Sequence, residues 1–244
     1  MNFNVHPVPY TAFDFIKTKA HKPLGDQMRP YTIIFSTMSV DGRIATEEGF
    51  SRLSCDEDFK VQHKLRAWSD AVLVGANTAI KDNPSLTVRK AVGKNPLRVV
   101  VDASLKVPPT LDMFSIPGKG VIITTENHSE EELAKYKERG IVIIRAGVGP
   151  EVDLSAAVRA LFEMGVRRLM IEGGGTTSYR FLKEGLVDEL WITLSPVVFG
   201  SGISVINGER SLLQDLYLRE LKVLCGGWIH LRYKVIKGES ERGI

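Results

Sequence analysis

The sequence predicts an α/β protein whose mainly parallel, mixed central sheet is flanked by helices. Short β-branched runs of strand length recur along the chain, and helix-like segments separate most of them. The last third has strand-like runs without clear helices between them, which indicates antiparallel strands added at one side of the sheet. A length of 244 residues favours one main core with an appendage.

The expected helices and strands follow from these runs and from the capping residues and glycines that begin and end them. Strands are expected at 31–38, 70–75, 97–102, 120–125, 141–145, 167–172, 189–199 and 227–237. Ser54 can cap a helix over 55–68, and Ser129 with Glu132 forms a capping box for a helix that reaches about Arg139. Two more helices are expected at 153–165 and 176–185, each ending at a glycine.

Residues 30–237 should form the main domain. Residues 1–29 read as an N-terminal extension, because Pro23-Leu24-Gly25-Asp26 is a linker signal, and 238–244 read as a C-terminal tail. The N-terminus lacks the uninterrupted apolar core of a secretory signal, and no apolar run reaches the roughly 20 residues needed to span a membrane. We therefore expect no membrane partner.

Composition narrows the classes of function. The 32 Lys and Arg residues are scattered among 29 acids for a net charge of +3, so nothing resembles a nucleic-acid-binding stripe. The only cysteines are Cys55 and Cys225, without a C-x-x-C, which argues against a multi-cysteine zinc site or a disulfide framework and fits a reducing cytoplasm. The five histidines are dispersed without metal spacing, so we expect no metal.

The stretch "RRLMIEGGGTTSYRFLKEG" combines a strand, a glycine turn and a helix. This order places free backbone N–H groups at a helix N-terminus, which favours an anion, although a plain turn stays open as the alternative. It matches neither the P-loop nor the G-x-G-x-x-G pattern. Glu172, at the end of the strand, can accept hydrogen bonds from a heterocycle's amino groups or can balance Arg167 or Arg168.

A second strand, glycine and helix unit occurs in "VLVGANTAIKDNPSLTVR". Both turns should open at the same edge of the sheet, because parallel strands share a carboxyl side. Arg66 and Arg89 have guanidinium groups that suit bidentate phosphate binding, although an arginine taken by itself is more often a solvated surface residue.

Four segments together resemble a known family. "STMSVDGRIAT", "SDAVLVGANTAIKDNPSLTVR", "PLRVVVDASLKVP" and "IEGGGTTSYRFLKEGLVDELWITLSPVVFG" look like the riboflavin-biosynthesis reductases, which have the dihydrofolate-reductase-like fold. The resemblance spans about 30–237. It implies reduction of the ribosyl side chain of 2,5-diamino-6-ribosylamino-4(3H)-pyrimidinone 5′-phosphate, or of its deaminated form, to a ribityl chain. NADPH supplies the hydride to C1′ of an imine formed on ring opening, with NADH not excluded.

The resemblance also implies roles for individual residues. Cofactor contacts are implied for Thr78, Asp82, Ala103, Gly174, Gly175, Thr176 and Thr177. Substrate contacts are implied for Arg66, Leu86, Arg89 and Glu172, with the arginines on the 5′-phosphate and Glu172 on the pyrimidine. From its place in the "SVDGR" turn, we infer that Asp41 lies beside the reacting ribose as a second catalytic residue, after Glu172.

Two departures from the bacterial bifunctional relatives shape the expectation. Those proteins carry a zinc deaminase domain with a P-C-x-x-C motif, which is absent here, so we expect no deaminase activity. This resembles the stand-alone reductases of archaea and fungi, which act before deamination. Some relatives also have a substrate-binding lysine in the first core strand, where this chain has Phe35-Ser36-Thr37.

Because the family forms dimers, we expect a homodimer, with the apolar run "LWITLSPVVFG" (190–200) as a candidate interface strand. Two rival functions stay open: reduction of a pterin-like or folate-like substrate on the same scaffold, and nucleotide binding for regulation without catalysis.

Overall fold

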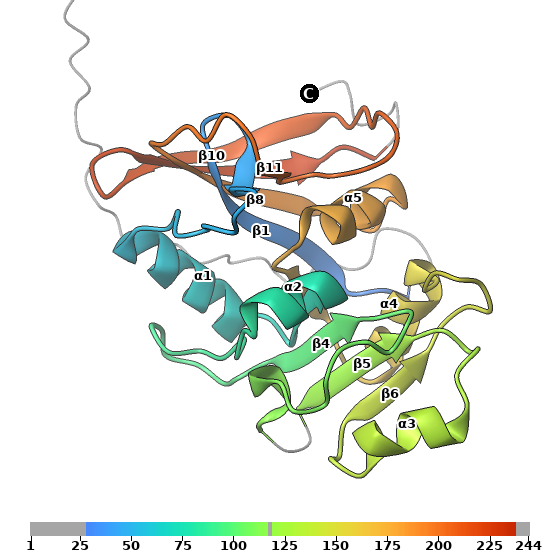
Figure 1. Ribbon diagram of the computed structural model, residues 1–244. Helices are drawn as coiled ribbons and strands as arrows, with labels where there is room; N and C mark the ends of the chain where they lie inside the picture. The colour runs from blue at the N-terminus through green and yellow to red at the C-terminus, as the bar shows by residue number, and fades with distance from the viewer. Residues whose placement is uncertain (1–27, 117–118, 238–244) are drawn as a thin grey trace, which may run out of the picture.

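A mixed sheet of nine strands forms the centre of the molecule (Figure 1). The computed structural model describes residues 28–116 and 119–237, so most of the expected extension (1–29) and all of the expected tail (238–244) lie outside it. The strand order is β10-β11-β8-β1-β7-β3-β4-β5-β6; β10 and β11 pair with each other and β11 pairs with β8 in antiparallel fashion, while the remaining pairs are parallel. Among the described residues, no helix is long and apolar enough to cross a membrane.

The elements alternate through the middle of the chain as the sequence predicts. The strands of the large sheet are β1 (Tyr31–Ser39), β3 (Ala71–Gly75), β4 (Leu97–Val101), β5 (Gly120–Thr124), β6 (Val142–Arg145), β7 (Arg168–Ile171), β8 (Glu189–Ser195), β10 (Leu216–Leu224) and β11 (Trp228–Val235). The short strands β2 (Arg43–Ala45) and β9 (Ile203–Ser204) pair separately. The helices are α1 (Asp56–Trp68), α2 (Ala76–Asp82), η1 (Asp112–Phe114), α3 (Glu130–Lys137), α4 (Leu154–Glu163) and α5 (Gly175–Lys183).

The strands are apolar on both sides because helices cover both faces of the sheet. In β1, Ile33 and Ile34 are both fully buried but belong to different cores. One core contains side chains of α4 and α5, and the other contains side chains of α1, α2 and α3. This double burial is what continuous β-branched runs indicate, and it confirms the predicted fold class.

One of the two predicted helix caps is confirmed. Ser129 and Glu132 form the reciprocal capping box of α3, and the Asp153 side chain accepts from the Ala156 N–H at the start of α4. The expected Ser54 cap of α1 is wrong by one residue: Cys55 is the N-cap residue and makes no side-chain cap. The Ser54 hydroxyl instead donates to the Thr37 hydroxyl at 3.1 Å, which ties the chain before α1 to β1.

The C-terminal strands differ from the expectation in two respects. The expected strand at 189–199 ends at Ser195, and it cannot serve as an edge or interface strand because β1 and β11 pair with its two sides. The edge strand is β10, which the sequence analysis missed. Its Leu, Arg, Glu and Lys residues favour helix, and an irregularity between Leu218 and Glu220 breaks its alternation.

The two cysteines form a disulfide. Cys55 and Cys225 are bonded across a sequence separation of 170 residues, and their Cα atoms lie 6.5 Å apart. The expectation against a disulfide is therefore wrong. It relied on the absence of closely spaced cysteines, whereas folding brings the start of α1 against the turn between β10 and β11.

Candidate active site

The two glycine turns lie side by side at the carboxyl edge of the sheet. They follow β3 and β7, which pair in parallel, so the predicted common edge is confirmed. The Gly75 N–H donates to the Gly173 carbonyl at 3.0 Å, and the Glu172 N–H donates to the Leu73 carbonyl at 3.0 Å. In chain order β3 and β7 are far apart, so the turns meet where the strand order switches, which is where ligands of open α/β sheets bind.

Three positions in these turns favour glycine, for different structural reasons. A Cβ on Gly75 would lie 2.3 Å from Thr177 Oγ1, and a Cβ on Gly174 would lie 2.9 Å from Thr78 Oγ1. These two glycines therefore let the turns pack against each other. Gly173 faces open space but has a φ of +108°, which side chains rarely adopt, and its peptide bond to Gly174 is cis.

The helices that begin at these turns lack side-chain caps. Gly75 and Gly174 are the N-cap residues of α2 and α5, whereas α3 and α4 are capped by Ser129 and Asp153. An uncapped first turn leaves backbone N–H donors for an external anion. Thr176 is exposed and Thr177 half-buried, while Gly175 packs under the Ser204 carbonyl. The arrangement at α5 thus fits an anionic ligand at Gly174, Thr176 and Thr177.

Glu172 forms a buried ion pair with Arg66. Arg66 Nε and Nη2 each donate to a different carboxylate oxygen at 2.6 Å, and Gln62 Nε2 donates at 3.0 Å. The side chains of Arg66 and Glu172 are 7% and 6% exposed. Burial lowers the pKa of Arg66 but the Glu172 charge outweighs it, so the guanidinium stays charged. The alternative partners Arg167 and Arg168 are engaged elsewhere: Arg168 pairs with Asp70, and Arg167 stacks on Phe162.

A pocket of about 260 Å³ opens beside this ion pair. It brings together Arg66, Leu86 and Arg89, the three residues of its lining for which the family resemblance implies substrate contacts. Asp82, expected to contact cofactor, lines the same pocket, and burial raises the pKa of its carboxyl group. The remaining lining residues are Asn83, Pro84, Ser85 and Asp112. Two arginines in one pocket make it suited to an anion such as a phosphate.

His63 is buried next to this pocket and helps to shape it. Its ring is 2% exposed, and its Nδ1 accepts from the Arg89 N–H at 3.0 Å. Burial, followed by the charges of Arg66 and Arg89, lowers the pKa of His63 to about 4. The neutral ring therefore fixes the backbone of Arg89. Gln62 was missed by the sequence analysis; the four-residue spacing of Gln62 and Arg66 on α1 was the available signal.

Ala103 and Asp41 lie in loops outside this pocket. The Ala103 carbonyl, at the end of β4, accepts from His128 Nε2 at 2.7 Å. The Asp41 carboxylate accepts from the Phe199 and Gly200 N–H groups at 3.1 and 2.8 Å. The Ser39 hydroxyl, together with these backbone groups, lowers the pKa of Asp41 to about 2. Asp41 therefore stays ionised and joins the loop after β1 to the loop after β8.

Fold and site together are those of an α/β protein suited to an anionic ligand, in which two glycine turns and a two-arginine pocket share one edge of the sheet. Residues 30–229 match the family model of the RibD C-terminal domain, and the chain belongs to that family.

Curated relatives include the 2,5-diamino-6-ribosylamino-4(3H)-pyrimidinone 5′-phosphate reductases of Methanothermobacter thermautotrophicus and Archaeoglobus fulgidus. The first is 40% identical over 75% of this chain and 86% of its own, and the second is 38% identical over 76% and 90%. Among solved structures, RibD of Acinetobacter baumannii superposes with a TM-score of 0.75 at 25% identity, covering 86% of this chain and 58% of that longer chain. A pyrimidine reductase-like protein of Corynebacterium diphtheriae gives 0.73 at 28% identity, covering 86% and 93%.

The contact between the two turns can be tested by Gly75→Ala. The added Cβ would lie 2.3 Å from Thr177 Oγ1, so we expect a loss of about 1–3 kcal/mol in the free energy of unfolding. Adding Thr177→Ala removes that oxygen, and the double variant should be more stable than Gly75→Ala by urea denaturation. Equal stability of the two variants would contradict the contact.

His63 predicts a pH dependence of stability. Its folded pKa of about 4 lies below the ordinary 6.5, so between these values the unfolded chain binds a proton that the folded chain does not. The contribution of His63 should therefore fall by up to about 3 kcal/mol as pH drops through this window. Urea denaturation of wild type and His63→Asn, which keeps an acceptor, should show a stability difference that shrinks towards pH 4; a pH-independent difference would contradict the assignment.

Proposed function

We propose that this chain reduces the ribosyl side chain of 2,5-diamino-6-ribosylamino-4(3H)-pyrimidinone 5′-phosphate to the ribityl chain in riboflavin biosynthesis. The observation that best supports this proposal is that Arg66 and Arg89 line the same pocket, near the glycine turns. A 5′-phosphate can be bound by both guanidinium groups, whereas the ring of a pterin carries no anionic group for them. Relatives at 38–40% identity carry the name of this reductase.

The cofactor side would be formed by the two turns. We assign the cofactor phosphates to the α5 N-terminus at Gly174, Gly175, Thr176 and Thr177, which lacks a side-chain cap. Family membership implies a nicotinamide cofactor, and we propose NADPH. The cofactor supplies the hydride, so the protein's task is to orient it against the ribosyl carbon and to exclude water.

We extend the cofactor side to Thr78, Asp82 and Ala103. Thr78 lies against Gly174 at the junction of the turns, and Ala103 presents its backbone at the neighbouring strand end. Asp82 also lines the arginine pocket, so it would stand at the boundary between cofactor and substrate.

On the substrate side, we assign the 5′-phosphate to Arg66 and Arg89, with Leu86 as the apolar wall. Arg66 has only part of its donors occupied: Nε and Nη2 bind Glu172, and Nη1 donates to the Thr87 carbonyl at 3.0 Å. Glu172 would then act mainly as a positioning residue for Arg66, with the lone pairs that remain on its oxygens available to a pyrimidine amino group. Its negative charge also compensates the buried charge of Arg66.

We also propose a cytoplasmic homodimer. Because β8 is an interior strand, the interface moves to the face of β10 and β11. That face exposes Leu218, Leu221, Val223 and Ile229 to between 36% and 57%, and apolar patches of this kind mark interaction sites. Sedimentation should give a dimer, and Leu221→Asp should give a monomer; a monomeric wild type would contradict this.

The function is tested by following oxidation of NADPH with the aminopyrimidine phosphate, with its deaminated form and with dihydrofolate. We expect turnover of the first. Turnover of dihydrofolate alone, or NADPH binding without oxidation, would contradict the proposal. The same assay with NADH tests the choice of cofactor.

Arg89→Ala should raise KM for the phosphorylated substrate by about 10- to 100-fold with little change in kcat, because it removes charge-assisted hydrogen bonds to phosphate. The matched control is Lys90→Ala. Lys90 is the next cation along the chain but pairs with Asp56, 2.9 Å away, and does not line the pocket. An unchanged KM for Arg89→Ala would remove Arg89 from the site.

Glu172→Gln should raise KM for the substrate by at least about 10-fold and leave the Kd for NADPH unchanged, since an amide cannot hold the Arg66 guanidinium by two charged bonds. If Glu172 acts through Arg66, the loss should be larger for the phosphorylated substrate than for its dephosphorylated form. Gln62→Ala, which removes only the third hydrogen bond, is the control and should have a smaller effect. Equal weakening of NADPH and substrate would contradict the assignment.

A further inference from the structure

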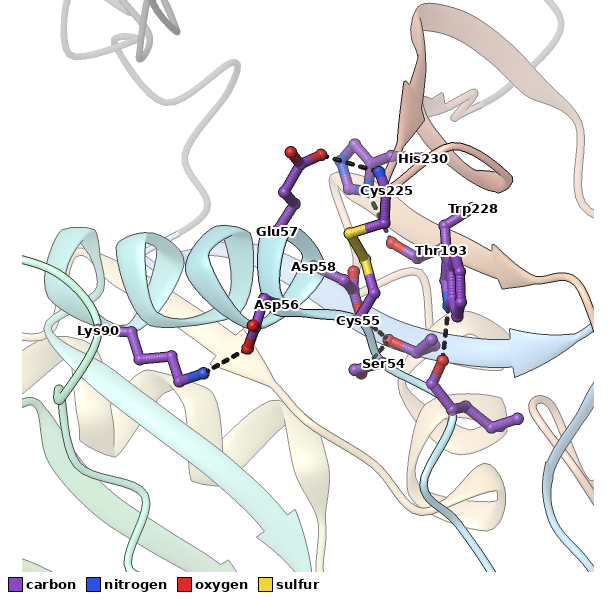
Figure 2. The surroundings of a disulfide bond; sticks show 12 residues. Ser54, Cys55, Asp56, Glu57, Asp58, Lys90, Thr193, Cys225, Trp228 and His230 are labelled. Carbon is purple, nitrogen blue, oxygen red and sulfur yellow. Dashed lines mark hydrogen bonds and ion pairs between the residues drawn. A yellow bond between two sulfur atoms is a disulfide. The ribbon is translucent and has the colours of Figure 1, made fainter.

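The disulfide joins two elements that lie outside the proposed active site. It links the residue before α1 to the turn between β10 and β11, and Figure 2 shows both cysteines between the helix and the hairpin. Cys225 is exposed and Cys55 is half-buried, so a small thiol can reach the bond. Neither cysteine has a part in the proposed reduction.

Cys225 occupies a backbone position that is unfavourable for it. The Gly227 N–H donates to the Leu224 carbonyl at 3.0 Å, and Cys225 and Gly226 have φ values of +47° and +72°. Positive φ at both central residues defines a type I′ turn, in which Asn-Gly is the favoured pair. A cysteine here is costlier than asparagine, and the disulfide is one of the interactions that hold it in place.

Two hydrogen bonds reinforce the junction beside the disulfide. The Cys225 N–H donates to the Glu57 carboxylate at 2.9 Å, and Trp228 Nε1 donates to the Leu53 carbonyl at 2.7 Å (Figure 2). The β10–β11 hairpin is thus held to the start of α1 and the residues before it by one covalent bond and two hydrogen bonds.

Beneath these contacts lies a buried polar pair, Asp58 of α1 and His230 of β11. Both are 0% exposed; Asp58 accepts from the Thr37 hydroxyl at 2.6 Å, and His230 Nδ1 lies 2.9 Å from the Thr193 hydroxyl. Asp58 Oδ1 and His230 Nε2 have no hydrogen-bond partner among the described residues. A buried polar atom without a hydrogen bond costs free energy, so this part of the junction contributes less to stability than a fully paired one would.

Movement here would be transmitted along α1. Asp58, Gln62 and Arg66 follow one another at intervals of four residues and therefore lie along one face of the helix. Asp58 binds β1, whereas Gln62 and Arg66 hold Glu172 at the end of β7. The start of α1 is thus tied to the hairpin and its end to the substrate pocket, while the glycine turns of the cofactor side do not touch the hairpin in any described contact.

We propose that the Cys55–Cys225 disulfide is a reversible redox latch, which fastens the β10–β11 turn to α1 and whose reduction loosens the substrate side of the cleft but not the cofactor side. Cys225 is exposed, and exposed disulfides are more readily reduced than buried structural ones. The effect on the cleft rests on the proposed function, whereas the latch itself does not.

The reductant is a dithiol. Its thiolate attacks the exposed Cys225 sulfur, and Cys55 leaves as a thiolate that takes up a proton. The second thiol of the reductant then displaces Cys225. Two electrons pass to the cysteines, which become thiols, and the reductant becomes a disulfide.

The test compares the full chain before and after dithiothreitol. Alkylation and mass measurement should find no free thiol before reduction and two after it. Reduction should lower Tm by about 5–15 °C and increase hydrogen exchange at 53–62 and 224–230, with the glycine turns unchanged. KM for the aminopyrimidine phosphate should rise severalfold while KM for NADPH stays constant.

Cys55→Ser and Cys225→Asn should both behave like the reduced chain and no longer respond to dithiothreitol. Cys225→Asn is the sharper variant, because asparagine suits the turn and only the bond is lost. Two free thiols in the untreated protein, or equal Tm and exchange in both states, would overturn the latch. An unchanged substrate KM in a reduced, active enzyme would overturn its link to the cleft. A chain that turns over no substrate would refute the proposed function, and Tm and exchange would still decide the latch.

Discussion

The arrangement of the site depends on the buried ion pair between Arg66 and Glu172. The two residues are 106 positions apart in the chain, and their side chains are 7% and 6% exposed. A charge at such depth is tolerable only when it is paired and hydrogen-bonded, so neither residue can be removed without stranding the other. Because Arg66 belongs to α1 and Glu172 to the turn after β7, the pair also fixes where the helix crosses the sheet edge.

The two sides of the site, on either side of this ion pair, would bind their ligands through different kinds of interaction. On one side, small residues let two turns pack tightly and leave the first turn of α5 without a side-chain cap, which favours phosphate through backbone donors and the helix dipole. On the other side, side-chain charge dominates, since Arg66 and Arg89 line one pocket and the neutral His63 ring holds the Arg89 backbone. A dinucleotide and a phosphorylated pyrimidine need these two environments next to each other.

Local sequence signals predicted much of the fold but little of its long-range pairing. Strands that are buried on both faces, such as β3 and β4, are rich in apolar and β-branched residues. The capping box at Ser129 involves residues only three positions apart. Both signals are local, so the sequence alone is enough to predict these elements. β10 was missed because its composition favours helix. The partner of Glu172 and the disulfide were misjudged because both depend on contacts more than 100 residues apart. The glycines were expected to admit a ligand, whereas two of them primarily admit the neighbouring turn.

The most direct test of the central claim is a double-mutant cycle of Arg66→Ala and Glu172→Ala, measured by urea denaturation without ligand. A buried, bidentate pair predicts that each single variant loses about 3–5 kcal/mol and that the double variant loses much less than their sum, a coupling above about 2 kcal/mol. Additive losses, with a coupling near zero, would mean that the two residues do not act as one unit and would contradict this account of the site.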